Sequence, residues 1–250
     1  MPAFLIMPVD YLRTLTATER SRRSNVHLGI FLTFNAGAIN AGGFLAVDEY
    51  TSHMTGVVST MADELALGQI DLALGALTSL IAFVIGAATS AIMINWARRR
   101  QSPHEYSMPL LLEAGLLLAF GLLGEYHHAI GTSIALTIAV LSFLMGLQNA
   151  MITKVSNAEI RTTHVTGLMT DIGIELGKLL YWNQSPDTVS KPAVRANFDK
   201  LKLHSMLVTT FFLGGVLGAL GFKHVGYIAT VPPAIALAIL SSMTFLPERR

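Results

Sequence analysis

Two copies of one short motif hold the side chains best suited to contact a solute. The first copy is Thr51-Ser52-His53-Met54-Thr55-Gly56, and the second is Thr162-Thr163-His164-Val165-Thr166-Gly167. When residues 51–65 are aligned with residues 162–176 without a gap, six positions are identical. Each copy combines an imidazole and hydroxyl groups, which form hydrogen bonds, with a glycine that allows close backbone approach. The chain therefore contains an internal repeat, which any fold assignment has to explain.

A second pattern places acids on the same helical face as the glycine of each motif. Residues spaced by four lie on one face of a helix. This spacing gives one face with Gly56, Thr60 and Glu64, and another with Gly167, Asp171 and Glu175. An acid inside a membrane is costly and usually faces the bundle interior or a water-filled cavity. If each segment starts a helix, the positive end of its dipole favours a small anion or polar solute.

Polar residues inside the apolar stretches complete the predicted pathway. Asn40 and Asn149 occupy equivalent positions in a second repeated block, 37–41 and 146–150. Glu113 is the most isolated acid, and it would be either neutral and hydrogen-bonded or part of a proton path. The predicted substrate-pathway residues are His53, Thr55, Gly56, Thr60, Glu64, His164, Thr166, Gly167, Asp171, Glu175, Asn40, Asn149 and Glu113.

A purely structural interpretation of the same residues stays open. Threonine and glycine at helix ends most often serve as caps and packing residues, and a lone histidine is most often a satisfied structural group. The segments after the motifs, 54–68 and 165–180, are either re-entrant or peripheral at the membrane interface. Re-entrant backbone is tolerated only inside protein or beside a cavity. Re-entrant motifs would either line a pathway or lock the two halves of the protein together.

The composition assigns most of the chain to a lipid bilayer. Hydrophobic residues make up 52% of the 250 residues and charged residues only 13%, against about 25% charged residues in soluble domains. The absence of cysteine excludes disulfides, thiolate metal sites and cysteine nucleophiles. Neither Gly-x-Ser-x-Gly nor His-Glu-x-x-His occurs. We therefore expect no enzyme activity, no catalytic residue, no metal and no cofactor.

Six charge-poor stretches are long enough for membrane-spanning helices, which need roughly 20 residues. They cover residues 24–47, 72–97, 107–124, 130–151, 203–222 and 224–247. We expect Pro232-Pro233 to kink the last of them. An amphipathic helix is expected at 194–203, and the first ten residues are expected to form a tail that associates with the membrane surface.

The basic residues predict the orientation of these helices. If both termini are cytoplasmic, all of the 17 Lys and Arg residues except Lys223 lie on the cytoplasmic side, as the positive-inside rule requires. Three spans separate the two motifs, so the two copies have opposite orientations, as in many transporters.

The predicted fold is an all-α integral membrane protein with six transmembrane helices in a 3+3 inverted-topology repeat. A short helix, either re-entrant or lying at the membrane interface, follows the first and the fourth span. The predicted parts are a cytoplasmic tail at 1–23, repeats at 24–125 and 126–247, a linker at 181–202 inside the second repeat, and a cytoplasmic C-terminus at 248–250.

Four segments of the chain resemble a known family of bacterial membrane proteins. The segments Asn35–Phe44, Tyr50–Gly56, Gly146–Ala150 and Thr163–Gly167 are similar to those of the YoaK-like family, and the likeness extends from about residue 20 to the last span. Many members have Asn after the first Thr-Gly, where this chain has Val57. The resemblance implies a multi-pass protein of the bacterial inner membrane, in a family of unknown function.

These observations favour a transporter or channel for a small polar or anionic solute. The alternatives are an intramembrane enzyme using His53 or His164 with a nearby acid, and a structural or regulatory membrane protein without flux. The expected partners are the lipid bilayer and an unidentified small solute or ion, with no nucleic acid. Small residues on the helix surfaces would also allow assembly into a homo-oligomer.

Overall fold

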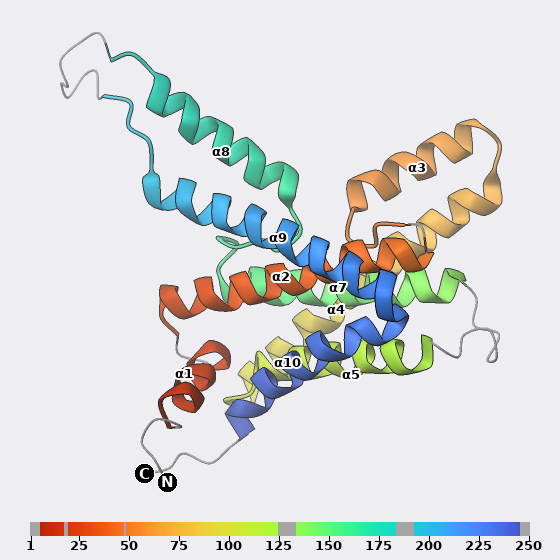
Figure 1. Cartoon of the computed structure of the whole chain (residues 1–250), viewed down its shortest axis with the longest axis horizontal. Coiled ribbons are helices and arrows are strands. Elements are labelled where there is room, and N and C mark those ends of the chain that lie inside the picture. Colours follow the sequence, from red (N-terminus) through yellow and green to blue (C-terminus); the bar gives the residue numbers. More distant parts are fainter. Residues whose placement is uncertain (1–5, 18–19, 48, 125–133, 184–192, 246–250) are drawn as a thin grey trace.

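The computed structural model describes residues 6–17, 20–47, 49–124, 134–183 and 193–245, which are helical with no strand. Figure 1 labels the helices. Their bounds are α1 Ile6–Thr16, α2 Arg22–Val47, α3 Met54–Ala66, α4 Ile70–Arg99, α5 Ser107–Gly124, α7 Ile134–Val155, α8 Val165–Leu180, α9 Phe198–Val225 and α10 Val231–Ser242, with 3₁₀ turns η2 at Gly226–Thr230 and η3 at Met243–Phe245.

Four stretches are long and apolar enough to cross a membrane. They are Arg22–Val47, Ile70–Arg99, Ile134–Val155 and Phe198–Phe245, and the last of these joins α9, η2, α10 and η3. The helix α5 is apolar but shorter. The all-helical membrane class is therefore confirmed, whereas six separate crossings remain a prediction.

Several predicted element boundaries differ from the structure. Pro232 and Pro233 stand at the start of α10 and do not kink a longer helix, because a proline in the first turn lacks an N–H that the helix would leave unpaired anyway. The helix expected at 194–203 is wrong in its first part, since α9 begins at Phe198 after Asn197 caps it by accepting from the Lys200 N–H.

Two further predictions concern the start of the chain and the fourth span. The first 23 residues are predicted as a tail, and the structure forms the helix α1 within them, at Ile6–Thr16. The fourth span begins by residue 134, and its expected start at 130 lies outside the described residues, as do 184–192 of the predicted linker.

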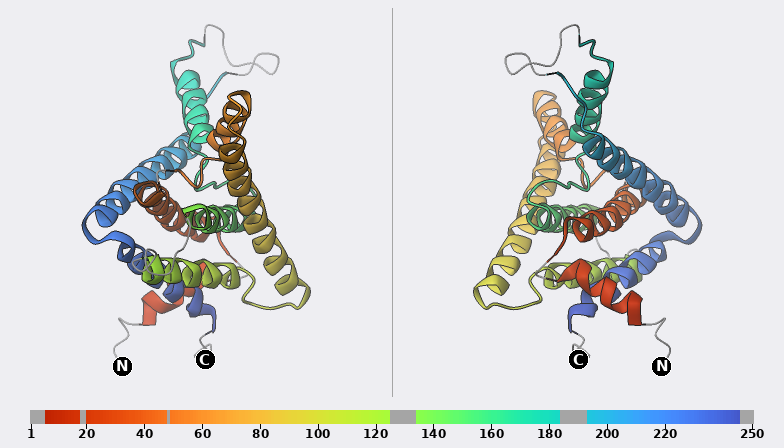
Figure 2. Two further views of the ribbon diagram at one scale, coloured as in Figure 1. Left: turned by 90° about the vertical axis from the view of Figure 1, so that its right-hand side faces the viewer. Right: turned by 90° about the vertical axis from the view of Figure 1, so that its left-hand side faces the viewer.

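The long helices associate in three pairs. Helix α2 packs along α9, α4 packs along α7, and α5 packs against α10. Figure 2 shows α4 and α9 as two slanted sides with α2 and α7 between them. In the most apolar 18-residue window, half of α2 and half of α7 is buried, against 22% of α4. The central position therefore belongs to α2 and α7, and α4 exposes large apolar side chains such as Ile81, Val84 and Ile92.

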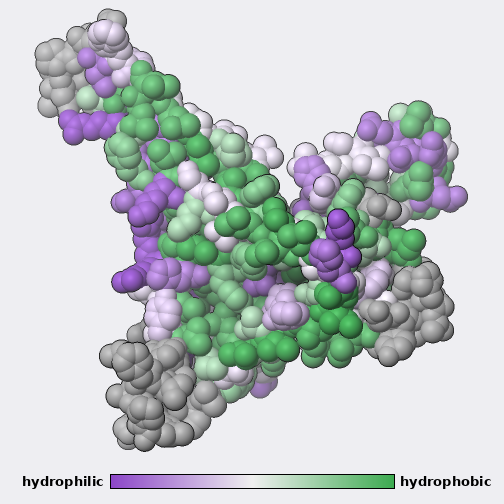
Figure 3. All heavy atoms as spheres, in the orientation of Figure 1, coloured by the Kyte–Doolittle hydropathy of each residue, from purple (hydrophilic) through white to green (hydrophobic). Residues whose placement is uncertain are grey.

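The surface is polarised in the way expected for a membrane protein. Apolar side chains cover most of the face shown in Figure 3. Hydrophilic side chains gather where α2 and α9 begin and, on the other side of the view, over α3. Contiguous exposed apolar surface of this extent marks a region that contacts lipid or another protein.

The pattern Phe-x-x-Gly occurs at the contact between helices in each of α2, α4, α7 and α9. The four segments are Phe34–Gly37, Phe83–Gly86, Phe143–Gly146 and Phe211–Gly214. A Cβ on Gly86 would lie 2.0 Å from the Phe143 carbonyl oxygen, and a Cβ on Gly146 would lie 2.0 Å from the Phe83 carbonyl oxygen. The α2–α9 pair repeats this arrangement, with 2.1 Å at both Gly37 and Gly214. Glycine thus allows backbone contact at both crossings.

Candidate functional site

The chain turns back toward the middle of the helices immediately after α2. The Oδ1 atom of Asn40 accepts hydrogen bonds from the Ser52 N–H at 3.3 Å and the Ser52 hydroxyl at 2.8 Å. Asn40 precedes the end of α2 at Val47 by about 10 Å along the helix axis, at 1.5 Å per residue. The first motif is therefore held well below the end of α2.

The second motif is held in the same way after α7. The Oδ1 atom of Asn149 accepts hydrogen bonds from the hydroxyls of Thr162 at 3.2 Å and Thr163 at 2.9 Å. Asn149 precedes the end of α7 at Val155 by about 9 Å. The two asparagines of the repeated block thus anchor the two copies of the motif.

Both motifs end at the start of a short helix that no side chain caps. His53 is the N-cap residue of α3 and His164 is that of α8, and neither makes a side-chain capping hydrogen bond. The first N–H groups of a helix have no intrahelical partner. Figure 1 shows that α3 and α8 start close to each other and extend toward opposite ends of the molecule.

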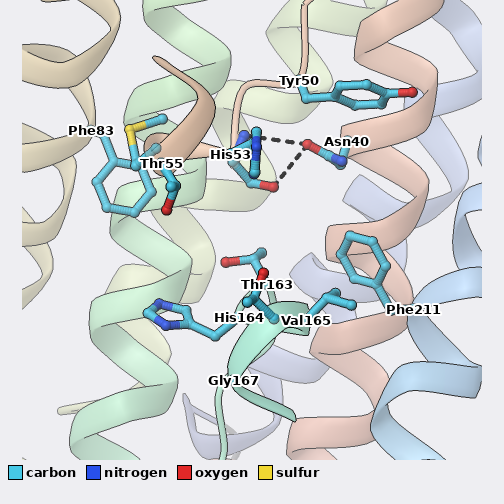
Figure 4. Close-up of a pocket in the computed structure, with 13 residues that line it drawn as sticks. Asn40, Tyr50, His53, Thr55, Phe83, Thr163, His164, Val165, Gly167 and Phe211 are labelled. Atoms are coloured by element: carbon cyan, nitrogen blue, oxygen red, sulfur yellow. Dashed lines mark hydrogen bonds between the residues drawn. The ribbon is translucent and has the colours of Figure 1, made fainter. Parts of the chain in front are cut away.

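The two helix starts share one cavity of about 610 Å³. His53 and His164 face it from opposite ends in Figure 4, with Phe83 and Phe211 on its two sides. Among the residues that the structure describes, no Asp, Glu, Lys or Arg lines it. The lining residues are Asn40, Tyr50, Ser52, His53, Met54, Thr55, Phe83, Thr163, His164, Val165, Thr166, Gly167 and Phe211.

Six of the predicted pathway residues line this cavity: Asn40, His53, Thr55, His164, Thr166 and Gly167. Asn149 lies behind it, bonded to the lining residue Thr163. Gly56 lies under the His53 ring, since a Cβ there would be 2.1 Å from the ring carbon Cδ2.

The acids of the predicted pathway do not line the cavity. Thr60 and Glu64 lie farther along α3, and the Glu64 Oε2 atom is buried without a hydrogen-bond partner. The carboxylate of Glu175 pairs with Lys178 at 2.8 Å and accepts from the Asn197 N–H at 2.7 Å, so it ties α8 to the start of α9. The four-residue spacing placed these acids on one helical face but could not show what that face contacts.

Asp171 contributes to a second, smaller cavity near the starts of α2 and α9. This cavity measures about 430 Å³. The Asp171 carboxylate pairs with Lys200 at 3.0 Å and lies 3.5 Å from the His204 ring. These contacts connect α8 to α9, and Asp171 is separate from the cavity between the motifs.

Glu113 is also away from the cavity between the motifs. Its side chain is fully buried, and its Oε1 atom accepts a hydrogen bond from the Gln148 side-chain amide at 2.9 Å. Gln148 is the immediate neighbour of Asn149 in α7.

Several residues of the cavity were missed from the sequence. Phe83 and Phe211 lie in predicted spans and were not predicted to line a cavity. The repeated Phe-x-x-Gly is a signal that could have singled them out. Tyr50 stacks on Phe44 with ring centroids 4.5 Å apart, and this contact orders the chain before the first motif. Among the described residues, no group of three His, Asp or Glu side chains could hold a metal ion.

Comparison with known proteins identifies the family. The chain matches the family described as "Protein of unknown function (DUF1275)" over residues 28–243. The chain belongs to this family. It is 26% identical to the UPF0700 transmembrane protein YoaK of Bacillus subtilis (strain 168), over 84% of this chain and 89% of that protein. It is 28% identical to the UPF0700 transmembrane protein RA0705 of Rhizobium meliloti (strain 1021), over 92% of each.

No solved structure matches this chain. The resemblance to the YoaK-like family is confirmed, and the names of the relatives agree with the long apolar helices. The DUF1275 chain described here is therefore a helical transmembrane protein.

Proposed function

We propose that this DUF1275 protein is a transporter or channel for a small polar or anionic solute, which binds between the two motifs. The observation that carries the proposal is the meeting of both motifs at one cavity of about 610 Å³. Sites for small molecules usually have volumes of about 300–1,000 Å³. The proposal involves no chemical conversion of the solute.

The proposal includes an inverted repeat of residues 24–125 and 126–247. Equivalent residues make equivalent contacts. Asn40 holds Ser52, which directly precedes His53, and Asn149 holds Thr162 and Thr163, the two residues before His164. The helix pairs support the same relation, because exchanging the two halves converts the α2–α9 pair into the α7–α4 pair. Transporters built from inverted repeats commonly bind solute at interrupted helices near the membrane centre.

The orientation follows from the charges. We place both termini in the cytoplasm, with α3 extending from the cavity to the outer surface and α8 extending to the inner surface of the bacterial inner membrane. In this arrangement α3 and α8 are re-entrant helices, which require a protein or aqueous surrounding.

The lining of the cavity favours an electron-rich solute. Two uncapped helix starts direct N–H groups and the positive ends of two helix dipoles toward it. Imidazole and threonine hydroxyl groups add further donors. No acid that would repel an anion lines the cavity within the described part of the chain.

Solute flux in reconstituted vesicles tests the proposal. We expect wild-type protein to accelerate the passage of chloride, nitrate or glycerol, followed by light scattering of vesicles under a solute gradient. His53→Ala and His164→Ala should each lower the rate at least several-fold, because each removes a donor from the cavity. His224→Ala is the matched control, since His224 is exposed and does not line the cavity.

Two results would contradict the pathway proposal. One is a rate no higher than that of protein-free vesicles for all three solutes. The other is a wild-type rate in both motif variants, provided that size-exclusion chromatography shows them to be folded as well as the His224→Ala control.

A further inference from the structure

A buried acid–amide pair lies between α5 and α7. The Glu113 side chain from α5 and the Gln148 side chain from α7 are both fully buried. The Gln148 amide nitrogen donates to Glu113 Oε1 at 2.9 Å and to the Leu32 carbonyl oxygen of α2 at 3.3 Å. Both amide hydrogens are thereby used, and three helices meet at this pair.

No charged group compensates the Glu113 carboxyl. The elements packed against α5 are α4, α7, α10 and η2, and α2 contributes the Leu32 carbonyl. Their titratable and charged residues are Arg22, Arg23, His27, Asp71, Arg98, Arg99, Lys154 and Tyr227. His27 lies in the second turn of α2 and Tyr227 lies in η2, whereas the others lie in terminal turns of their helices. Within the described residues none of them forms an ion pair with Glu113.

With an ionised Glu113, the pair lacks one hydrogen-bond donor. The two atoms without a partner are Glu113 Oε2 and Gln148 Oε1, and in an ionised pair both are acceptors. A proton on Oε2 would turn that atom into a donor for which the amide oxygen is the complementary acceptor. A buried carboxylate with a single hydrogen bond and no cation is costly, so the protonated form suits this environment.

The fold itself does not require a polar pair at this position. The repeated blocks align Gln148 with Ile39, which is 2% exposed and packs in an apolar cluster with residues such as Leu117 and Ala234. One half of the chain therefore has an apolar contact where the other half has an acid and an amide. If this position served packing alone, apolar residues would suffice in both halves.

We propose that Glu113 is a proton-binding site that couples proton movement to passage of solute through the cavity. Loss of the proton leaves a carboxylate that must gain water, which requires α5 to separate from α7. Gln148 is adjacent to Asn149, whose Oδ1 atom holds the cavity residue Thr163, so a shift of α7 reaches the second motif directly. The coupling rests on the proposed transport function, whereas proton binding at Glu113 does not.

Infrared spectroscopy of the purified protein tests proton binding without any solute. We expect the carbonyl stretching band of a protonated carboxyl near neutral pH, which decreases as the pH rises. Glu113→Gln should remove the band, and the control Asp63→Asn, which changes an exposed acid of α3, should keep it. An unchanged band in Glu113→Gln, or no such band in the wild type, would overturn the proposal.

A second variant keeps the test decisive if Glu113→Gln does not fold. Gln148→Ile introduces the residue type found at the equivalent position of the first half. The carboxyl band should persist but shift to higher frequency, because the Glu113 carbonyl loses its hydrogen bond. A band at the wild-type frequency would show that the protonated carboxyl belongs to another residue.

Flux measurements separate this inference from the transport function. These measurements use vesicles with an internal pH dye and whichever of chloride, nitrate and glycerol the wild-type protein carries. A gradient of that solute should change the internal pH, and Glu113→Gln should abolish that change. Solute flux without any pH change in the wild type would overturn the coupling and leave the transport proposal intact. A titrating Glu113 band in a protein without flux would overturn both the coupling and transport, while proton binding stands.

Discussion

Two asparagines determine where the motifs lie. Asn40 and Asn149 sit inside long helices, yet their side-chain oxygens accept from chain segments that follow the ends of those helices. Without these bonds each segment would leave polar backbone and hydroxyl groups unpaired among the helices, which is costly. The asparagines therefore act as anchors for the histidines rather than as direct evidence of a solute contact, although Asn40 also lines the cavity.

Removal of an anchor should loosen one motif at a time. Asn149→Ala removes two hydrogen bonds from threonine hydroxyls, and with about 0.6 kcal/mol for an average bond between membrane helices we expect a loss of about 1 kcal/mol in stability. Because the chain has no cysteine, a single Val165→Cys can report on the cavity. Its labelling by a thiol reagent should become several-fold faster in Asn149→Ala.

The first half offers a matched comparison. Asn40→Ala should have the same effect on labelling of Met54→Cys, which also lines the cavity. Asn35→Ala is the control, since Asn35 is in the same helix but donates only to the Phe31 carbonyl of its own helix among its resolved contacts. Equal labelling rates in Asn40→Ala and Asn35→Ala would show that the anchor does not position the motif.

At the scale of elements, glycine determines how closely the helix pairs approach. Lipid and apolar side chains attract a helix about equally, so helices in membranes associate through close packing and hydrogen bonds. The reciprocal contacts of Gly86 with Phe143 and of Gly146 with Phe83 allow this close approach between α4 and α7. Phe83 takes part in these contacts, and Phe211 takes part in the equivalent contact with Gly37. Both phenylalanines also line the cavity, so helix packing and the site share one motif.

One added methyl group at a crossing should destabilise the protein. Gly86→Ala would place a Cβ 2.0 Å from a backbone oxygen, which cannot move aside as a side chain could. We expect a loss of about 1–3 kcal/mol, the usual range for overpacking, measured as lower thermal stability in detergent.

Gly75→Ala in the same helix is the control for this prediction. A Cβ at Gly75 meets no atom within 4 Å, and replacing a helical glycine by alanine usually stabilises by about 0.5–1 kcal/mol. If Gly86→Ala is as stable as Gly75→Ala, the crossing is looser than described.

At the scale of the whole molecule, we propose that α3 and α8 are re-entrant helices and that neither crosses the membrane completely. Both start at the central cavity, and they diverge from it toward the two ends of the long axis of the molecule (Figure 1). If α3 crossed the membrane completely, the turn before α4 would lie in the cytoplasm and the basic end of α4 would lie outside, against the positive-inside rule.

Thiol labelling should place the far ends of these two helices on opposite sides. We expect Gln69→Cys, in the exposed turn between α3 and α4, to react with a membrane-impermeant maleimide in intact cells. Tyr181→Cys, at the exposed end of α8, should react only after the membrane is permeabilised. Labelling of both positions from the same side would exclude opposite orientations of the two halves.

The sequence by itself determined the features that depend on local composition and repetition. Low charge indicated a membrane protein, charge-free runs located the long helices to within a few residues, and α5 and α8 have the predicted bounds. The repeated motif identified both histidines of the cavity, and the second block identified Asn40, which lines the cavity, and Asn149, which lies behind it. Such features depend on residues that are close together in the sequence, so a pattern along the chain can reveal them.

Only the tertiary structure decided which of the polar residues share a site. Glu175 follows its motif histidine by eleven residues on the predicted face, yet it pairs with Lys178 and the start of α9 because α8 leads away from the cavity. Phe83 and Phe211 lie far from either motif in the chain and reach the cavity through the helix crossings. The partner of a helical face depends on how distant helices pack, and the spacing of residues within one helix does not contain that information.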